Sequence, residues 1–235
     1  MSDILIIFPN NVQLKKLTEK AGFWFSELVH FYTVLKLQKY HVDMVTPLGG
    51  KVVPDVMSTR RFFLDKEADA YYYSKGFMQK FEDTASIDSI VEKNYKAVYL
   101  AGGFAAIHYY TTNQRINEVV GKIFTNGGYV AATGLAVAAL INLTTSNNDF
   151  LIDRKQITGL SLFEENLLGV RKTFDIHIQE EIKKRNAFYS KAFFPLTSYA
   201  IKDGRIITGE NSNSTRAVAW QLVYSLRDQT KSGNR

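Results

Sequence analysis

The sequence predicts a three-layer α/β/α sandwich built on a mostly parallel sheet. Short apolar, β-branched runs alternate with segments of helical periodicity, which is typical of parallel strands joined by crossover helices. The run at 129–133 is nearly all apolar, as expected for a strand in the centre of such a sheet. A length of 235 residues suits one domain covering 1–235.

The predicted strands follow from apolar runs that end at turn residues. We expect strands at 4–8, 42–46, 97–100, 129–133 and 156–158, with a short edge strand at 51–54. A hairpin is predicted at 199–208, because Asp203-Gly204 has the composition of a tight turn.

The predicted helices follow from apolar residues at three- and four-residue spacing. They cover 25–39, 119–126, 135–143, 164–168, 175–185 and a last segment from Asn211 or Ser212 to about 226. Gly127-Gly128 forms a helix cap, and residues 228–235 form a frayed polar tail. Residues 55–93 carry mixed charges and aromatics with no strand of parallel-sheet type, so they are predicted to form a small helical insertion.

The composition excludes several classes of function. The chain has no cysteine, which excludes disulfides, thiolate metal sites and thiol nucleophiles. Its net charge of +6 is scattered without a basic stripe, so we expect a solvated surface and no nucleic-acid partner. No apolar run approaches the roughly 20 residues of a membrane span, and we expect a cytoplasmic protein without a membrane partner. The histidines lack metal-ligand spacing and the glycine pairs lack a nucleotide fingerprint, so no metal or cofactor is expected.

Three stretches resemble the ThiJ/PfpI superfamily, particularly its branch of glyoxalase III enzymes and heat-shock holding chaperones. They are 94–103, a strand that ends at Gly102-Gly103; 126–135, a strand that ends at Gly134-Leu135; and 203–211, a hairpin that ends at Gly209-Glu210-Asn211. The resemblance implies a flavodoxin-like fold of the class I glutamine amidotransferase kind. It also implies a homodimer.

The resemblance also identifies what has changed at the expected active site. In the family a strand leads to a sharp turn that carries a reactive cysteine followed by a histidine. The same frame places Gly134 at the cysteine position and Leu135 at the histidine position. A glycine adopts the strained backbone of such a turn without a Cβ penalty. The turn is therefore expected to persist without its nucleophile.

Two acidic positions of the family persist. Glu27 falls where the family keeps a buried glutamate beside the cysteine, and Glu165 falls where the glyoxalase branch has the acid that orients the histidine. We expect a vestigial pocket formed by Glu27, Gly103, Gly134, Leu135 and Glu165. For Glu165 a second interpretation, a solvated acid at a helix start next to Glu164, is favoured. Thr133 is expected to be a core residue and not a nucleophile.

The leading functional hypothesis is a non-catalytic family member, a pseudoenzyme that binds a small metabolite or an unfolded client protein, as in a stress-related holding chaperone. The alternative is a glyoxalase-like or hydrolase-like enzyme with a cysteine-free site around Glu27 and His108, where His108 acts as a base. A third possibility is a structural subunit whose apolar patch, formed by Phe23, Trp24 and Phe25, covers the pocket mouth.

Overall fold

A seven-stranded sheet forms the middle layer of the computed structural model, which describes residues 4–144 and 149–233. Five neighbouring pairs of strands are parallel, and the last pair is the antiparallel hairpin. In spatial order the strands are β3 (Ala85–Ser86), β2 (Val42–Thr46), β1 (Ile4–Ile7), β4 (Ala97–Leu100), β5 (Tyr129–Thr133), β9 (Ile206–Gly209) and β8 (Ala200–Asp203). The predicted fold class is confirmed.

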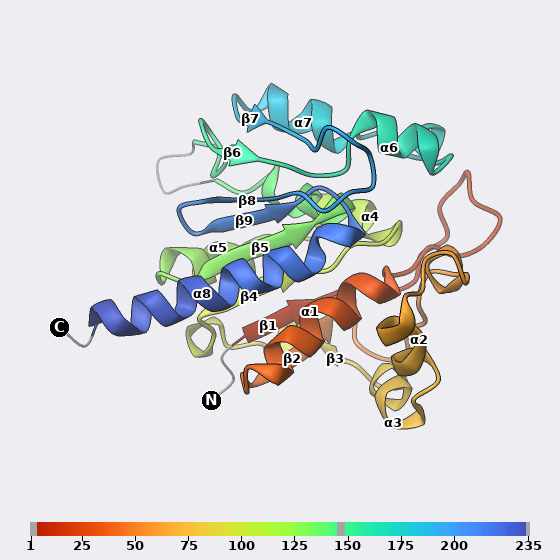
Figure 1. Ribbon diagram of the computed structural model, residues 1–235, viewed down its shortest axis with the longest axis horizontal. Helices are drawn as coiled ribbons and strands as arrows, with labels where there is room; N and C mark the ends of the chain where they lie inside the picture. Colours follow the sequence, from red (N-terminus) through yellow and green to blue (C-terminus); the bar gives the residue numbers. More distant parts are fainter. Residues whose placement is uncertain (1–3, 145–148, 234–235) are drawn as a thin grey trace.

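Helices cover both faces of this sheet, with α1 and α8 in front of it and α4 and α5 behind it in Figure 1. The helices are α1 (Phe25–Leu37), α2 (Lys66–Tyr72), α3 (Lys75–Met78), α4 (Ala105–Thr112), α5 (Gln114–Thr125), α6 (Leu162–Leu167), α7 (Ile178–Lys184) and α8 (Thr215–Gly233). A two-stranded sheet of β6 (Gln156–Ile157) and β7 (Phe188–Tyr189) lies with α6 and α7 beyond β8. Among the described residues, no helix is both long and apolar enough to cross a bilayer.

Alternate residues of each strand supply the two halves of the core. Ile4 and Ile6 of β1 belong to the cluster formed with α1 and α8, whereas Leu5 and Ile7 belong to the cluster formed with α5 and the segment after β5. All four side chains are fully buried. This pattern explains why β1 is apolar at every position, because a strand between two helical layers has no solvent face.

The expected elements differ from the structure at several places. Residues 51–54 form no strand, since the backbone N–H of Val53 donates to the side chain of Asn11. The sheet edge is instead β3, which lies in the segment 55–93 that was predicted to lack a parallel strand; that prediction is wrong. The segment after β5 is a 3-10 helix, η5 (Gly134–Leu140), where an α-helix was expected. The last helix continues to Gly233, because the polar residues after Leu226 include no helix breaker before it.

The remaining short 3-10 helices lie mostly in connections between larger elements. They are η1 (Met57–Thr59), η2 (Gln79–Phe81), η3 (Ile87–Ser89), η4 (Glu92–Asn94), η6 (Arg171–Thr173) and η7 (Ser212–Ser214). Three of them, η1, η2 and η3, lie within the segment 55–93 together with α2 and α3, and η4 begins at its end. This segment lies beside the start of α1, at the edge where the parallel strands end (Figure 1).

Candidate functional site

A pocket of about 310 Å³ lies at the carboxyl ends of the parallel strands. Its lining comes from the start of α1, from the loops that follow β4, β5 and β9, and from residues 62–65 of the helical segment. In open α/β sheets ligands bind at this edge, because the loops that leave neighbouring strands separate there. The expected site residues Glu27, Gly103, Gly134 and Leu135 all line this pocket.

Glu27 is a buried carboxyl group on the first turn of α1, and its side chain reaches the wall of the pocket. Its Oε2 atom accepts hydrogen bonds from the backbone N–H of Gly102, at 2.7 Å, and from Thr133 Oγ1, at 2.8 Å. Burial raises the pKa of Glu27 to about 7, although these two hydrogen bonds act in the opposite direction. The group can therefore both accept and release a proton near neutral pH.

Two buried hydroxyl groups, those of Thr133 and Tyr99, form a hydrogen-bonded chain that leads from the core to Glu27. Thr133, at the end of β5, is fully buried, and its hydroxyl lies 2.7 Å from that of Tyr99 on β4. Because the single Thr133 proton is donated to Glu27, Tyr99 must donate to Thr133. Burial and the nearby Glu27 raise the pKa of Tyr99 well above its usual value, so the tyrosine stays protonated as this role requires. Thr133 is thus a core residue that orients Glu27.

Gly134 occupies the turn between β5 and η5, directly in front of the other oxygen of Glu27. Its φ angle of +54° lies in the left-handed region that glycine adopts without strain. A Cβ atom built at this position would lie 3.3 Å from Glu27 Oε1 and 3.9 Å from the Cα of Asn211, with no other contact within 4 Å. The turn therefore leaves open space beside Oε1, where a small ligand can reach the carboxyl group.

Gly103 is required by close packing of two loops. Its φ is +118°, and an added Cβ would lie 2.3 Å from the carbonyl oxygen of Gly22 and 2.6 Å from the Cα of Phe23. Backbone atoms cannot yield as a flexible side chain can.

We expect Gly103→Ala to lower the free energy of unfolding by more than about 2 kcal/mol, because the methyl group meets backbone on a left-handed residue. Gly76→Ala is the matched control: nothing lies within 4 Å of an added Cβ, and the residue is in α3. It should be neutral or stabilising by up to about 1 kcal/mol. Urea unfolding measures both, and equal effects would contradict this account of the loop.

His30 and Asp65 add a second ionisable pair to the pocket wall. His30 follows Glu27 by three residues on α1, and its Nε2 atom lies 3.0 Å from Asp65 Oδ2. Burial lowers the pKa of His30, which favours the neutral imidazole. Burial opposes ionisation of Asp65, but the Ala68 N–H, the His30 ring and Arg216 outweigh it and lower the pKa of Asp65 to about 2. The two side chains therefore form a close pair, although His30 Nε2 makes no hydrogen bond of good geometry.

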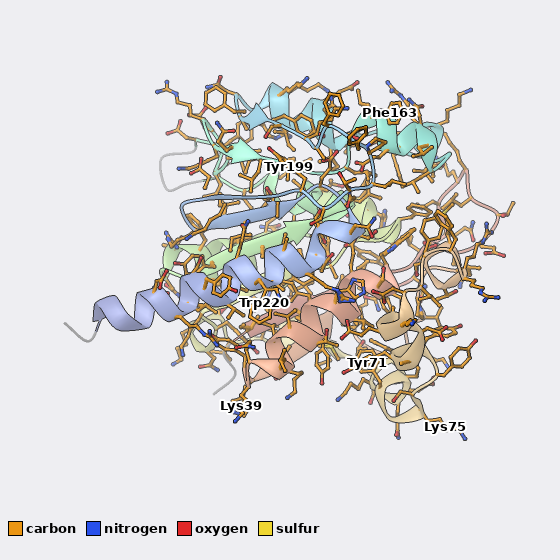
Figure 2. The ribbon with its side chains drawn as sticks, in the orientation of Figure 1. Lys39, Tyr71, Lys75, Phe163, Tyr199 and Trp220 are labelled. Atoms are coloured by element: carbon orange, nitrogen blue, oxygen red, sulfur yellow. The ribbon has the colours of Figure 1, made fainter. Side chains whose placement is uncertain are left out.

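The rest of the pocket wall is mostly apolar. Trp24 packs edge-on against Phe63 and Phe104, with ring centroids 5.1 Å and 5.7 Å apart. The second tryptophan of the chain, Trp220, stacks on Tyr224 along α8, away from the pocket (Figure 2). The apolar patch suggested for Phe23, Trp24 and Phe25 over the pocket mouth is not formed, because all three side chains are buried and, of the three, Trp24 alone lines the pocket.

The chain was next compared with known proteins. A model of the DJ-1/PfpI family matches residues 19–224. The chain belongs to this family. It is 25% identical over 216 residues to the glutathione-independent glyoxalase HSP31 of Saccharomyces cerevisiae, covering 89% of this chain and 91% of the yeast protein.

Solved structures agree with the DJ-1/PfpI assignment. The Francisella tularensis Rapid Encystment Protein 24 kDa superimposes with a TM-score of 0.89 at 27% identity, over 96% of this chain and 99% of that one. Glyoxalase III from Candida albicans superimposes with a TM-score of 0.86 over 95% and 96% of the two chains. At 22% identity the second likeness concerns the fold alone.

The names of these DJ-1/PfpI relatives correct the leading functional hypothesis. The sequence was interpreted as that of a non-catalytic pseudoenzyme or holding chaperone, yet the curated relatives of similar length are named as glyoxalases. These names contradict that interpretation, which is wrong. The comparisons favour the alternative, a glyoxalase-like enzyme.

Two of the expected site residues lie elsewhere in this DJ-1/PfpI fold. Glu165 does not line the pocket; its Oε2 atom lies 2.6 Å from Nδ1 of His177 at the start of α7. Its favoured interpretation as a solvated acid is also wrong, since Glu164 and Glu165 are both fully buried. His108 lies on the exposed side of α4 and is not part of the pocket lining.

Glu164 and Glu210 form a buried acidic pair behind the pocket wall. Glu164 Oε1 accepts from Asn211 Nδ2 at 2.7 Å and from the backbone N–H of Leu196 at 2.9 Å, and both of these partners line the pocket. Burial raises the pKa of Glu210 to about 7, and the neighbouring Glu164 acts in the same direction. A proton held by Glu210 avoids a buried pair of like charges.

No candidate metal site is present among residues 4–144 and 149–233. In these ranges no three His, Asp or Glu side chains lie close enough together to hold a metal ion. His30 and Asp65 are the ionisable pocket residues that sequence reasoning missed. A signal for His30 was present, because residues three apart on a helix share a face and Glu27 had already been selected. Asp65 belongs to another segment and had no such signal.

Proposed function

We propose that this protein is a cysteine-free, glyoxalase-like enzyme that converts α-oxoaldehydes into 2-hydroxy acids, with Glu27 as the acid-base group. The observation that carries the proposal is the state of Glu27. One carboxylate oxygen is held by two hydrogen bonds, the other faces open space in a pocket, and burial raises the pKa of the group to about 7. The glyoxalase names of the relatives support the reaction class.

We further propose that Gly134 and Leu135 stand where related enzymes carry a cysteine and a histidine. The φ of +54° at Gly134 and the position of this residue between strand and helix support the first assignment. Leu135 is nearly buried and lines the same pocket. In this chain the carboxyl group that would neighbour the thiol is left to act on the substrate directly.

The proposed reaction is an isomerisation of the hydrated aldehyde and needs no oxidant or reductant. Oε1 of ionised Glu27 removes the proton from C1 of the hydrate, and the electron pair moves into the adjacent C2 carbonyl to give an enediolate. The protonated Glu27 then returns a proton to C2, and the enol collapses to the carboxylic acid. The substrate hydrate and the hydroxy acid have the same atoms, so the step balances.

A pKa near 7 suits a group that must remove one proton, exchange it with solvent and then donate a proton to the neighbouring carbon. An ordinary glutamate would be too weak a base for a carbon acid, and a more strongly raised pKa would leave the group protonated at neutral pH. Neutral His30, whose Nε2 atom lies close to Asp65, is proposed as a positioning residue at the same end of the pocket.

The proposal is tested by following product formation from methylglyoxal by proton NMR. The purified protein should form lactate above a protein-free blank, and pretreatment with iodoacetamide should leave the rate unchanged, because the chain has no cysteine. Lactate is measured instead of methylglyoxal loss, since α-oxoaldehydes also react with arginine side chains. Absence of lactate above the blank would reject the proposed function.

A further inference from the structure

The pocket is larger and more aromatic than a methyl-substituted substrate needs. Its volume is about 310 Å³, whereas an apolar cavity of about 150 Å³ is enough to bind benzene. A dicarbonyl group with a methyl substituent would leave much of this space to water. A benzene ring together with the dicarbonyl group would fill it.

The aromatic side chains are grouped around this space. Trp24, Phe63 and Phe104 are packed edge to face, and Phe62 continues the group with its ring centroid 5.0 Å from that of Phe63. Phe62 lines the pocket but is 83% exposed, so a ligand ring at the mouth would remove it from water. Aromatic rings favour edge-to-face and offset contacts with one another. The wall is thus suited to a planar ring.

The charged groups of the pocket indicate that the substituent of the substrate is uncharged. No lysine or arginine is among the residues that the structure places in the pocket lining, and the ionisable groups there are Glu27, Asp65 and neutral His30. A carboxylate or phosphate on the substrate would meet Glu27 and Asp65 in the lining, whereas Arg216 lies outside the lining and is already paired with Asp65 at 2.7 Å. The substituent must therefore be uncharged. The carboxylate of the product meets the same acids, which favours its release.

We propose that the substrate of this pocket is an α-oxoaldehyde that carries a neutral aromatic ring. This inference rests on the proposed function for the reactive end of the substrate, whereas the ring-binding part rests on the aromatic wall alone. The ring lies against Trp24, Phe62 and Phe63, and the dicarbonyl group lies toward Glu27. The wall selects the ring, and the acids exclude charged analogues.

Turnover and binding are tested separately. For turnover, the formation of mandelate from phenylglyoxal is compared with the formation of lactate from methylglyoxal. We expect kcat/KM for phenylglyoxal to exceed that for methylglyoxal by at least about tenfold, the discrimination that an apolar pocket gives for even one methylene group. For binding, saturation-transfer NMR compares acetophenone with benzoate, which has the same ring and a negative charge. Acetophenone should bind and benzoate should not.

Two variants connect these results to the wall. Phe62→Ala and Phe63→Ala should each lower kcat/KM for phenylglyoxal by about tenfold, with a much smaller loss for methylglyoxal, and should weaken the acetophenone signal. Phe193→Ala is the matched control, because Phe193 is 92% exposed and lies outside the pocket lining. It should change neither measurement.

The outcomes separate the two proposals. If acetophenone binds in a manner that depends on Phe62 and Phe63 but neither aldehyde is converted, the ring selectivity stands and the proposed reaction is wrong. If methylglyoxal is converted at least as well as phenylglyoxal and acetophenone does not bind, the reaction stands and the aromatic substrate class is wrong. Binding of benzoate equal to that of acetophenone would also overturn the inference.

Discussion

Replacing Glu27 with glutamine should lower the rate of 2-hydroxy acid formation by at least about 100-fold, the usual contribution of a positioned acid-base group. Glutamine has nearly the same shape, and its amide oxygen can accept the hydrogen bonds that Gly102 and Thr133 donate to Oε2. The fold should therefore persist while the exchangeable proton is lost. The measurement is kcat/KM for the wild type and the variant, and a variant with wild-type activity would contradict the role of Glu27.

The stability of the same variant provides a control on the state of Glu27. Because the pKa is about 7 in the folded protein and 4.5 for the ordinary group, the folded state binds more protons than the unfolded state between these pH values. The contribution of Glu27 protonation to the free energy of unfolding is therefore fully present below a pH of about 4.5. It is lost as the pH rises through about 7. Glu27→Gln abolishes this loss.

The expected difference follows from the size of that shift. Relative to the wild type, the stability of Glu27→Gln should increase between pH 5 and pH 8 by roughly 3 kcal/mol, since one pKa unit corresponds to about 1.4 kcal/mol. Urea unfolding at both pH values measures the difference. A pH-independent difference would show that Glu27 is already ionised as in water.

The second large effect is expected from the double variant Gly134→Cys, Leu135→His. The new Cβ at position 134 would lie 3.3 Å from Glu27 Oε1, so a thiol there would be close to the carboxyl group. If these positions are those of the reactive pair in related enzymes, the double variant should exceed the wild-type rate of lactate formation by at least about tenfold. Its activity should also become sensitive to iodoacetamide.

The single variant Gly134→Ala controls for changes in the backbone. An alanine at φ +54° is strained and should cost about 1 kcal/mol of stability without adding a nucleophile. A gain that is seen in the double variant and not in Gly134→Ala must therefore come from the introduced thiol and imidazole. An inactive, folded double variant would argue against the assignment of Gly134 to the cysteine position.

Most of the fold could be predicted from the sequence because burial on both faces leaves a simple pattern. Strands such as β1 and β5 are buried and apolar or nearly so throughout, and the Asp203-Gly204 turn marks the hairpin of β8 and β9. The edge strand β3 could not be predicted, because two residues carry no periodicity. Its pairing with β2 depends on long-range packing that no local pattern encodes.

The candidate site could be predicted only in part. Glu27, Gly103 and Gly134 were found through the resemblance to the ThiJ/PfpI family, and the structure brings them together in one pocket. Asp65 was missed because it comes from the helical segment, whose position relative to α1 depends on tertiary contacts. Glu165 was assigned to the pocket by its place in the sequence, but its side chain lies toward His177.

The functional hypothesis failed for a chemical reason. A missing cysteine was interpreted as a missing reaction, although an α-oxoaldehyde hydrate can rearrange by proton transfer alone. The proposed reaction depends on the raised pKa of Glu27, which arises from burial in the folded protein.

The most direct test of cysteine-free catalysis by Glu27 is the conversion of methylglyoxal in D₂O, followed by NMR of the lactate. Proton transfer through an enediolate predicts enzyme-dependent lactate with deuterium at C2, and Glu27→Gln should not form it. Lactate that retains the original hydrogen at C2, or equal formation by wild type and Glu27→Gln, would contradict the mechanism.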